Sequence, residues 1–220
     1  MSSLHSLARF VHARARAHAD DTEECELCAA SLDDEHAHIV DLDRHALCCA
    51  CRACALLFAR SGVGARRYRT VPSRVLIDPS FALSDEEWRQ LEVPVRLAFV
   101  FFSSPLGRWV ACYPSPAGTA EAELCFEAWN KLATERPLVR AVEPDVEALL
   151  LYGKRGASGA PLEAFLVPID ACYALVARVR RHWSGIEGGD EVRREVEEFF
   201  SGLRARCRPL SAAHERGGQP

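Results

Sequence analysis

Six of the ten cysteines in this 220-residue chain fall within thirty residues, in the order Cys25, Cys28, Cys48, Cys49, Cys51 and Cys54. Two C-x-x-C pairs about twenty residues apart can close a tetrahedral thiolate site, because each two-residue gap allows one tight turn to direct two sulfurs at one ion. The spacing therefore predicts a site for one metal ion in this segment.

The order of the predicted elements indicates which cysteines bind the ion. The pair Cys25 and Cys28 forms a knuckle, residues 38–41 and 45–48 form a hairpin, and residues 51–58 form a helix, an order that resembles a treble-clef zinc finger. We predict Cys25, Cys28, Cys51 and Cys54 as the ligands, with 22 residues between the pairs.

Two further cysteines remain alternatives as ligands. Pairing Cys48 with Cys51 leaves 19 residues between the pairs, which suits the usual spacing of such sites, and Cys49 is a third candidate. His36 and His38 could also bind an ion, but with surplus cysteines nearby we interpret them as surface residues or residues that support the ligands.

The type of ion follows from the ligand set. Four thiolates complete a tetrahedron and leave no position for water, which argues against hydrolytic chemistry and favours structural zinc or one-electron iron. Rubredoxin-like knuckles usually carry glycine after the second cysteine, whereas this chain has Ala29 and Ala55 there. We therefore predict zinc, with iron as the alternative.

The compartment decides whether these cysteines bind metal or form disulfides. The N-terminus has no uninterrupted apolar core, and no stretch approaches the eighteen or so apolar residues of a membrane span. We expect a cytoplasmic, reduced protein without a membrane span. Four more cysteines lie among apolar residues and receive no function: Cys112, Cys125, Cys172 and Cys207.

Composition describes an ordinary globular chain, with 49% hydrophobic and 26% charged residues and a net charge of -4. We predict an α+β protein in which a small four-cysteine zinc-finger module, treble-clef or zinc-ribbon-like, spans residues 21–60. An amphipathic helix in residues 1–20 precedes it, and a connector with a short helix follows in residues 61–92. Ser84 and Glu87 predict the capping box of that helix.

Residues 93–208 are predicted to form the larger domain, with a disordered tail in residues 209–220. Strands are expected at 95–102, 108–113, 147–152 and 162–167, and helices at 120–135, 170–183 and from residue 190. The last helix would bury Phe199. The pattern predicts a largely antiparallel four-stranded sheet covered by helices.

This larger domain carries no motif of an enzyme. Nucleotide-binding glycine loops, zinc-protease and serine-hydrolase motifs are missing from the sequence, and the only histidine within 93–208 is His182. Glu143, Asp145 and Glu147 are interpreted as a solvated acidic approach to a strand. We expect no catalytic residues.

Seven sequence blocks do match a pattern. They are C-E-L-C at 25–28, H-x-H-x-V-D at 36–41, L-C-C-A-C-R-A-C-A-L-L-F at 47–58, R-Y-R-x-V-P at 67–72, Y-P-S-P-A-G at 113–118, E-P-D-V-E-A-L-L at 143–150, and V-P-I-D-x-C-Y-x-L-V at 167–176 followed by R-R-H-W-x-G. Over residues 23–206 the chain resembles an uncharacterised actinobacterial-type family, called only a domain of unknown function. Members are often encoded in gene clusters for nickel-iron hydrogenases, so the resemblance implies an accessory, maturation or assembly role and no mechanism.

The sequence thus predicts a non-enzymatic zinc-binding protein that binds a hydrogenase subunit or another assembly factor. The first alternative is a rubredoxin-like one-electron carrier with iron at the same cysteines. The second is a zinc-finger protein that binds nucleic acid through four arginines, which the acidic net charge disfavours. Those arginines are Arg52, Arg66, Arg67 and Arg69. The oligomeric state is left open.

Overall fold

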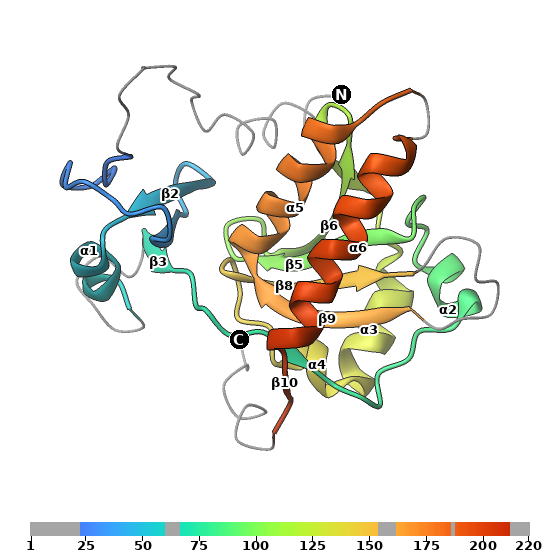
Figure 1. The fold of residues 1–220 in the computed structure, drawn as a ribbon. Coiled ribbons are helices and arrows are strands. Elements are labelled where there is room, and N and C mark those ends of the chain that lie inside the picture. The colour runs from blue at the N-terminus through green and yellow to red at the C-terminus, as the bar shows by residue number, and fades with distance from the viewer. Residues whose placement is uncertain (1–22, 60–66, 154–161, 186–187, 212–220) are drawn as a thin grey trace, which may run out of the picture. The chain divides into compact units, whose positions relative to one another are not determined.

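The computed structural model describes residues 23–59, 67–153, 162–185 and 188–211 (Figure 1). The chain divides into two compact units, Met1–Pro72 and Ser73–Pro220. The amphipathic helix predicted in residues 1–20 lies outside the described residues, as does the predicted tail of residues 209–220 from residue 212 onward; its first residue, Pro209, lies in a strand.

The first unit is built on a three-stranded antiparallel sheet. Its strands are β1 (Ala37–Asp41), β2 (Ala46–Ala50) and β3 (Tyr68–Thr70), in the order β2-β1-β3, and one helix, α1 (Arg52–Leu57), follows β2. The predicted hairpin is therefore present, with β1 and β2 as its arms. Part of the predicted connector, residues 68–70, pairs with β1 as β3.

A buried carboxylate closes the turn of this hairpin. Asp41 is 1% exposed, and its Oδ1 accepts hydrogen bonds from the backbone N–H groups of Asp43 and Arg44 at 3.1 and 3.2 Å. Its Oδ2 accepts from Arg67 Nη2 at 3.0 Å. Burial raises the pKa of Asp41, but the Arg67 guanidinium and the turn N–H groups outweigh that effect and lower it.

The second unit contains a seven-stranded sheet. Its strands are β4 (Leu76–Ile77), β5 (Leu97–Ser103), β6 (Arg108–Ser115), β7 (Gly118–Ala122), β8 (Glu147–Tyr152), β9 (Glu163–Pro168) and β10 (Arg208–Pro209). They lie in the order β10-β4-β9-β8-β5-β6-β7, and every pair is antiparallel except β10 with β4.

The prediction of four strands was wrong in number. The four predicted strands are present as the contiguous centre β9-β8-β5-β6, and the structure adds β7 on one side and β4 and β10 on the other. Strands β4 and β10 have two residues each, too few to show the alternation that identifies a strand in a sequence. Residues 118–122 extend the β5–β6 hairpin as β7, so the helix expected from residue 120 begins at Phe126 instead.

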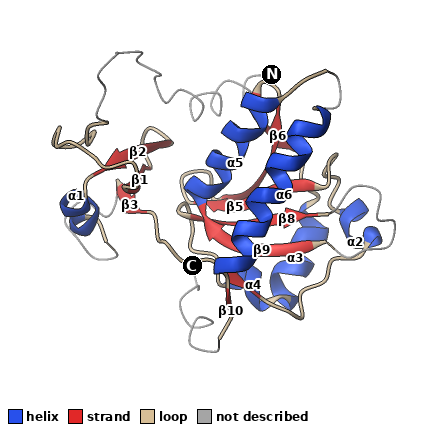
Figure 2. Cartoon of the chain, viewed as in Figure 1, coloured by secondary structure: helices blue, strands red, loops and turns tan. Residues whose placement is uncertain are grey.

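Helices cover both faces of this sheet (Figures 1 and 2). One face carries α5 (Ile169–His182) and α6 (Gly189–Arg206), and the opposite face carries α3 (Phe126–Glu135) and α4 (Pro137–Arg140). On the α6 side Phe200 is fully buried and stacks on Tyr152, with ring centroids 4.1 Å apart. Phe200 therefore occupies the core position that we had predicted for Phe199, which is only half-buried.

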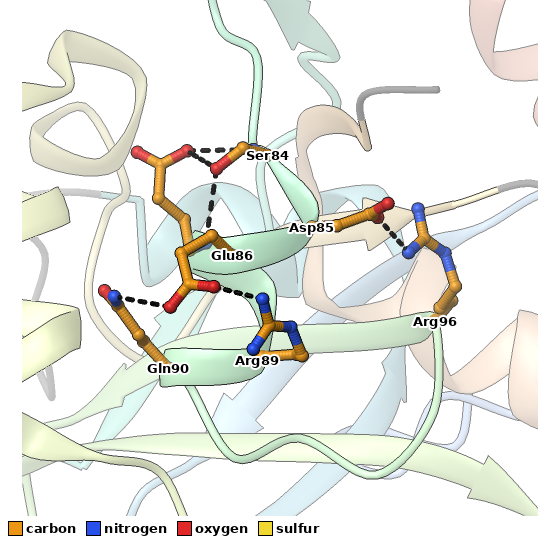
Figure 3. Close-up of polar contacts among 7 residues, drawn as sticks. Ser84, Asp85, Glu86, Arg89, Gln90 and Arg96 are labelled. Atoms are coloured by element: carbon orange, nitrogen blue, oxygen red, sulfur yellow. Dashed lines mark hydrogen bonds and ion pairs between the residues drawn. The ribbon is translucent and has the colours of Figure 1, made fainter. Parts of the chain in front are cut away.

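Helix α2 (Asp85–Gln90) begins with the predicted capping box. The Ser84 hydroxyl accepts a hydrogen bond from the Glu87 N–H, and Glu87 Oε2 accepts from the Ser84 N–H at 2.8 Å. Figure 3 shows this helix start, where Asp85 pairs with Arg96 and Glu86 binds Arg89 and Gln90. These hydrogen bonds and ion pairs stabilise the first turn of a short helix whose Trp88 packs in the core.

Two of the three acidic residues at the start of β8, Asp145 and Glu147, are buried and Glu143 is half-buried, contrary to our expectation of a solvated approach. Glu147 is 0% exposed, and its carboxylate accepts two hydrogen bonds from Arg74, at 2.6 and 2.7 Å, and one from the Glu143 N–H at 2.9 Å. Asp145 is also buried and accepts from the Ser104 N–H at 2.7 Å. The partner of Glu147 lies 73 residues away in the sequence, beyond the reach of any local pattern.

Candidate metal centre

The first two cysteines lie in a tight knuckle. Ala29 N–H donates to the Cys25 carbonyl at 2.8 Å, and Cys25 N–H donates to the Ala30 carbonyl at 2.8 Å. Ala29 has a φ of 58°, a left-handed conformation that glycine adopts most easily. The turn therefore forms without the glycine that such knuckles usually carry.

The other two cysteines lie at the start of α1. Cys51 is the N-cap residue, with extended backbone, and its sulfur accepts a hydrogen bond from the Cys54 N–H at 3.5 Å. Cys54 follows in the first helical turn and is buried. A helix start holds these two side chains on the same side, because residues three apart on a helix are neighbours.

These four sulfur atoms lie within 4.8 Å of one another, as a group that could hold a metal ion. The Cys28 and Cys51 sulfurs, which belong to different pairs, are 3.7 Å apart. A tetrahedral ion with bonds to sulfur of about 2.3 Å separates its ligands by about 3.8 Å. The structure thus brings together the four predicted cysteines, and the separation of the Cys28 and Cys51 sulfurs matches that of a tetrathiolate site.

Neither alternative cysteine belongs to this group. In the β1–β2 ladder Cys48 is opposite Ile39 and Cys49 is opposite His38. Because successive strand residues point to opposite faces, Cys48 turns into the core of the unit and Cys49 turns away from it. What excludes Cys48 is its position on the core side of β2, outside the four-cysteine group; burial also raises its pKa to about 12.

The thiols of the four-cysteine group differ in acidity. Burial raises the pKa of Cys25, but backbone N–H groups of Cys51, Leu27 and Cys28 directed at its sulfur outweigh that effect and lower it to about 6. Burial and the neighbouring sulfurs raise the pKa of Cys54 to about 12. Several thiolates this close together repel one another, and a bound cation would remove that repulsion.

The helix start also distinguishes this centre from a rubredoxin-like site with two knuckles. Ala55, in the position where a second knuckle would carry glycine, lies inside α1. At the first pair, Ala29 already adopts the left-handed turn, so the missing glycine there does not discriminate between zinc and iron. One knuckle, one hairpin and one helix follow one another here, the order of elements predicted from the sequence.

Three of the four arginines considered for nucleic-acid binding lie within the described residues, and the third of them, Arg69, is half-buried in β3. Arg52 is exposed, whereas Arg67 binds Asp41 and lies 3.5 Å from Asp43. Arg66 lies outside the described residues. Because Arg67 is paired with acidic neighbours, less positive charge of the basic segment 66–69 is available to bind phosphates.

A second group of possible ligands was not recognised as a site in the sequence. His36, His38 and Cys49 place their ligand atoms within 4.8 Å of one another. The H-x-H spacing at 36–38 was visible, but its proximity to Cys49 depends on the pairing of β1 with β2.

Comparison with known proteins assigns most of the chain to one family. The sequence model of a family of unknown function, DUF5947, matches residues 24–207. No curated protein and no solved structure matches the chain. Among the described residues, no helix has the length and apolar character needed to cross a membrane.

Proposed function

We propose a role for a chain that belongs to the DUF5947 family of unknown function: it is a non-enzymatic zinc-binding accessory protein that acts by binding another protein. The observation that carries the proposal is the group Cys25, Cys28, Cys51 and Cys54, with sulfur atoms within 4.8 Å of one another. Four thiolates saturate a tetrahedral ion, so zinc here would hold the fold together and leave no position for a substrate.

The small first unit has reason to need an ion. Its core comprises five buried residues, two of which are themselves cysteines of the group: Cys25, Ile39, Cys48, Ala50 and Cys54. So small a core stabilises a unit of this size poorly without a metal or a disulfide. An ion at the four cysteines would join the knuckle to α1 and make the unit rigid.

An exposed apolar pair on α1 supports a protein partner. Leu56 and Leu57 are 66% and 62% exposed, the two highest values among the large hydrophobic residues that the structure reports as exposed. They follow Cys54 within the same helix, so an ion that fixes α1 also fixes these two side chains. A rigid surface loses less conformational entropy when it binds a partner.

The partner we propose is a subunit of a nickel-iron hydrogenase or another factor in its assembly. The resemblance of the seven sequence blocks to a family encoded beside such enzymes supports this choice. The test is co-purification of the tagged chain with hydrogenase subunits from cells that make the enzyme, with elemental analysis of the purified chain.

The paired variants make this test specific. Leu56→Ser combined with Leu57→Ser should abolish co-purification while one zinc ion per chain is retained, because neither side chain belongs to the four-cysteine group. Leu106→Ser combined with Phe126→Ser removes two exposed apolar side chains of the other unit and should change nothing. Unchanged co-purification in the first double variant would contradict the proposed surface.

Iron at the same cysteines is a second candidate, because backbone N–H groups of Leu27, Cys28 and Cys51 are directed at the Cys25 sulfur. Such hydrogen bonds tune the reduction potential of iron–thiolate sites. A purified chain that contains iron and shows a visible charge-transfer band, bleached by reductant, would establish the electron-carrier function. A colourless chain with one zinc ion would rule it out.

A further inference from the structure

We propose that His36, His38 and Cys49 form a second metal site, with an open coordination position, for a divalent cation of the zinc or cobalt type. The proposed function involves only the closed four-cysteine centre, so this site goes beyond it. The two sites would share one small unit and have different chemistry.

Strand pairing brings the three residues together. His38 in β1 is directly opposite Cys49 in β2, so their side chains share one face of the hairpin. His36 lies two residues before His38, and their ring centroids are 4.9 Å apart. The three ligand atoms lie within 4.8 Å of one another.

The hydrogen bonding of His36 leaves one ring nitrogen able to bind a cation. Nδ1 lies 2.8 Å from the Asp33 carbonyl oxygen, and since a carbonyl can only accept, Nδ1 carries the proton and donates it. In the neutral ring the lone pair is therefore on Nε2. That atom is buried without a hydrogen-bond partner, and the side chain is only 9% exposed.

A buried nitrogen with an unused lone pair is unfavourable unless something binds it. Metal-binding histidines typically donate their other ring N–H to a carbonyl or a carboxylate, which fixes the ring and its tautomer. His36 has both kinds of group beside Nδ1, because Glu23 Oε2 lies 3.6 Å away. The surroundings of His36 are thus those of a metal ligand.

The backbone of Cys49 is held by the knuckle of the first site. Glu26 N–H donates to the Cys49 carbonyl at 3.0 Å, and Glu26 Oε1 accepts from the Cys49 N–H at 2.9 Å. Glu26 lies between Cys25 and Cys28, so an ion that orders the knuckle also positions Cys49. We expect the four-cysteine centre to fill first and the second site to follow.

The ligand set defines the chemistry of this second ion. Two imidazoles and one thiolate suit zinc and cobalt, and three protein ligands leave the fourth tetrahedral position for water or an external donor. Bonds of about 2.0–2.3 Å require ligand separations of about 3.3–3.8 Å, so a pair of ligand atoms near the 4.8 Å limit must close by about an ångström when the ion binds. Binding would release the Cys49 thiol proton to solvent, while the Nδ1 proton of His36 stays on its ring.

Cobalt titration of the full-length, metal-stripped chain under reducing conditions tests the proposal. The first equivalent should give the spectrum of a tetrathiolate. The second should add a weaker thiolate charge-transfer band and d–d bands at shorter wavelength, because imidazole nitrogen produces a stronger ligand field than sulfur. We expect two cobalt ions per chain.

Variants test which residues bind the second ion, and the spectrum of the first ion shows whether each variant is folded. His36→Gln and Cys49→Ser should each lower the affinity for the second cobalt ion by about 100-fold or more, since loss of a residue that only hydrogen-bonds a ligand already costs about 10–100-fold in metal affinity. The first-equivalent spectrum should persist, which shows that the unit is folded. His182→Gln and Cys125→Ser, at a histidine and a cysteine of the other unit, are the matched controls and should bind two ions.

The outcomes separate this inference from the proposed function. A wild-type chain that binds a single cobalt ion with a tetrathiolate spectrum overturns the second site and leaves the first intact. A second equivalent that survives both His36→Gln and Cys49→Ser also overturns it. A wild-type chain that shows no tetrathiolate spectrum with the first equivalent of cobalt would instead contradict the proposed function.

Discussion

Arg74→Met should destabilise the second unit strongly, because it removes the cation that neutralises Glu147. The Glu147 carboxylate is fully buried and accepts two of its hydrogen bonds from Arg74, whose Nη2 also donates to the Ala141 carbonyl at 3.0 Å. Removal of one partner of a buried ion pair costs about 3–5 kcal/mol. For a unit of this size that loss lowers Tm by about 6–20 °C, at roughly 2–4 °C per kcal/mol.

The destabilisation should depend on pH in a defined direction. Burial raises the pKa of Glu147, while Arg74 and the Glu143 N–H oppose that rise. Without Arg74 the pKa rises further above the unfolded value near 4.3. The folded state then binds the proton more tightly than the unfolded state, so stability falls as pH increases from about 4.3 through the folded pKa. The difference from wild type should be largest at neutral pH and shrink on acidification.

Urea unfolding followed by tryptophan fluorescence measures this effect. All four tryptophans, Trp88, Trp109, Trp129 and Trp183, lie in the second unit, so the signal reports on that unit alone. The comparison is made at pH 7 and at pH 5, and the free energy of unfolding is extrapolated to water.

Two further variants separate charge from packing. Glu147→Gln in the Arg74→Met background should recover most of the loss, because the buried group is then neutral. Arg140→Met removes an exposed arginine that donates to the Thr134 carbonyl and should change stability by about 0.5 kcal/mol or less. A loss in Arg74→Met that is under about 1 kcal/mol, or equal at both pH values, would refute the argument that an unpaired buried carboxylate is responsible.

Three other outcomes follow from the structure. Cys54→Ser should lose the ion and the hydrogen-exchange protection of β1 and β2 but leave tryptophan fluorescence unchanged. The control Cys125→Ser should keep the ion and the protection. Protection of β1 and β2 that persists without metal would argue against a structural ion at the four cysteines. Glu87→Gln should cost about 0.3–1 kcal/mol at pH 7 in urea unfolding, because glutamine can keep the capping box but lacks the negative charge near the helix N-terminus. Because the Ser84 N–H and Arg136 lower the pKa of Glu87, that deficit should shrink as pH falls below the unfolded value of about 4.3 and disappear below the lowered pKa. A deficit independent of pH would exclude the charge as its cause. Phe200→Ala should destabilise the second unit by about 3–5 kcal/mol and Phe199→Ala by much less. Equal losses of stability in the two variants would contradict the assignment of Phe200, rather than Phe199, to the core.

The sequence by itself determined the parts of this protein that depend on short-range geometry. A turn that pairs Cys25 with Cys28 and a helix start that pairs Cys51 with Cys54 each involve four consecutive residues. Spacing alone slightly favoured Cys48 with Cys51 as the second pair, and the predicted helix start decided for Cys51 with Cys54. The capping box at Ser84 and the four central strands of the sheet are local in the same sense. Hydrophobic runs of six or seven residues identify such strands before their partners are known.

Only the tertiary structure decided what depends on which strand lies beside which. The register of β1 with β2 turned Cys48 into the core and placed Cys49 beside His38, and no count of intervening residues contains that information. Strands β4 and β10 have two residues each and exist only through their neighbours in the sheet.

The acidic segment at residues 143–147 shows the same limit in its electrostatics. Its charges indicated solvent exposure, but Arg74 supplies a buried cation for Glu147 from 73 residues away. Whether a charged side chain is buried depends on whether the fold brings it a partner, because an unpaired charge in the core is too costly. That pairing is a property of the folded chain, and it reversed the prediction made from the local sequence.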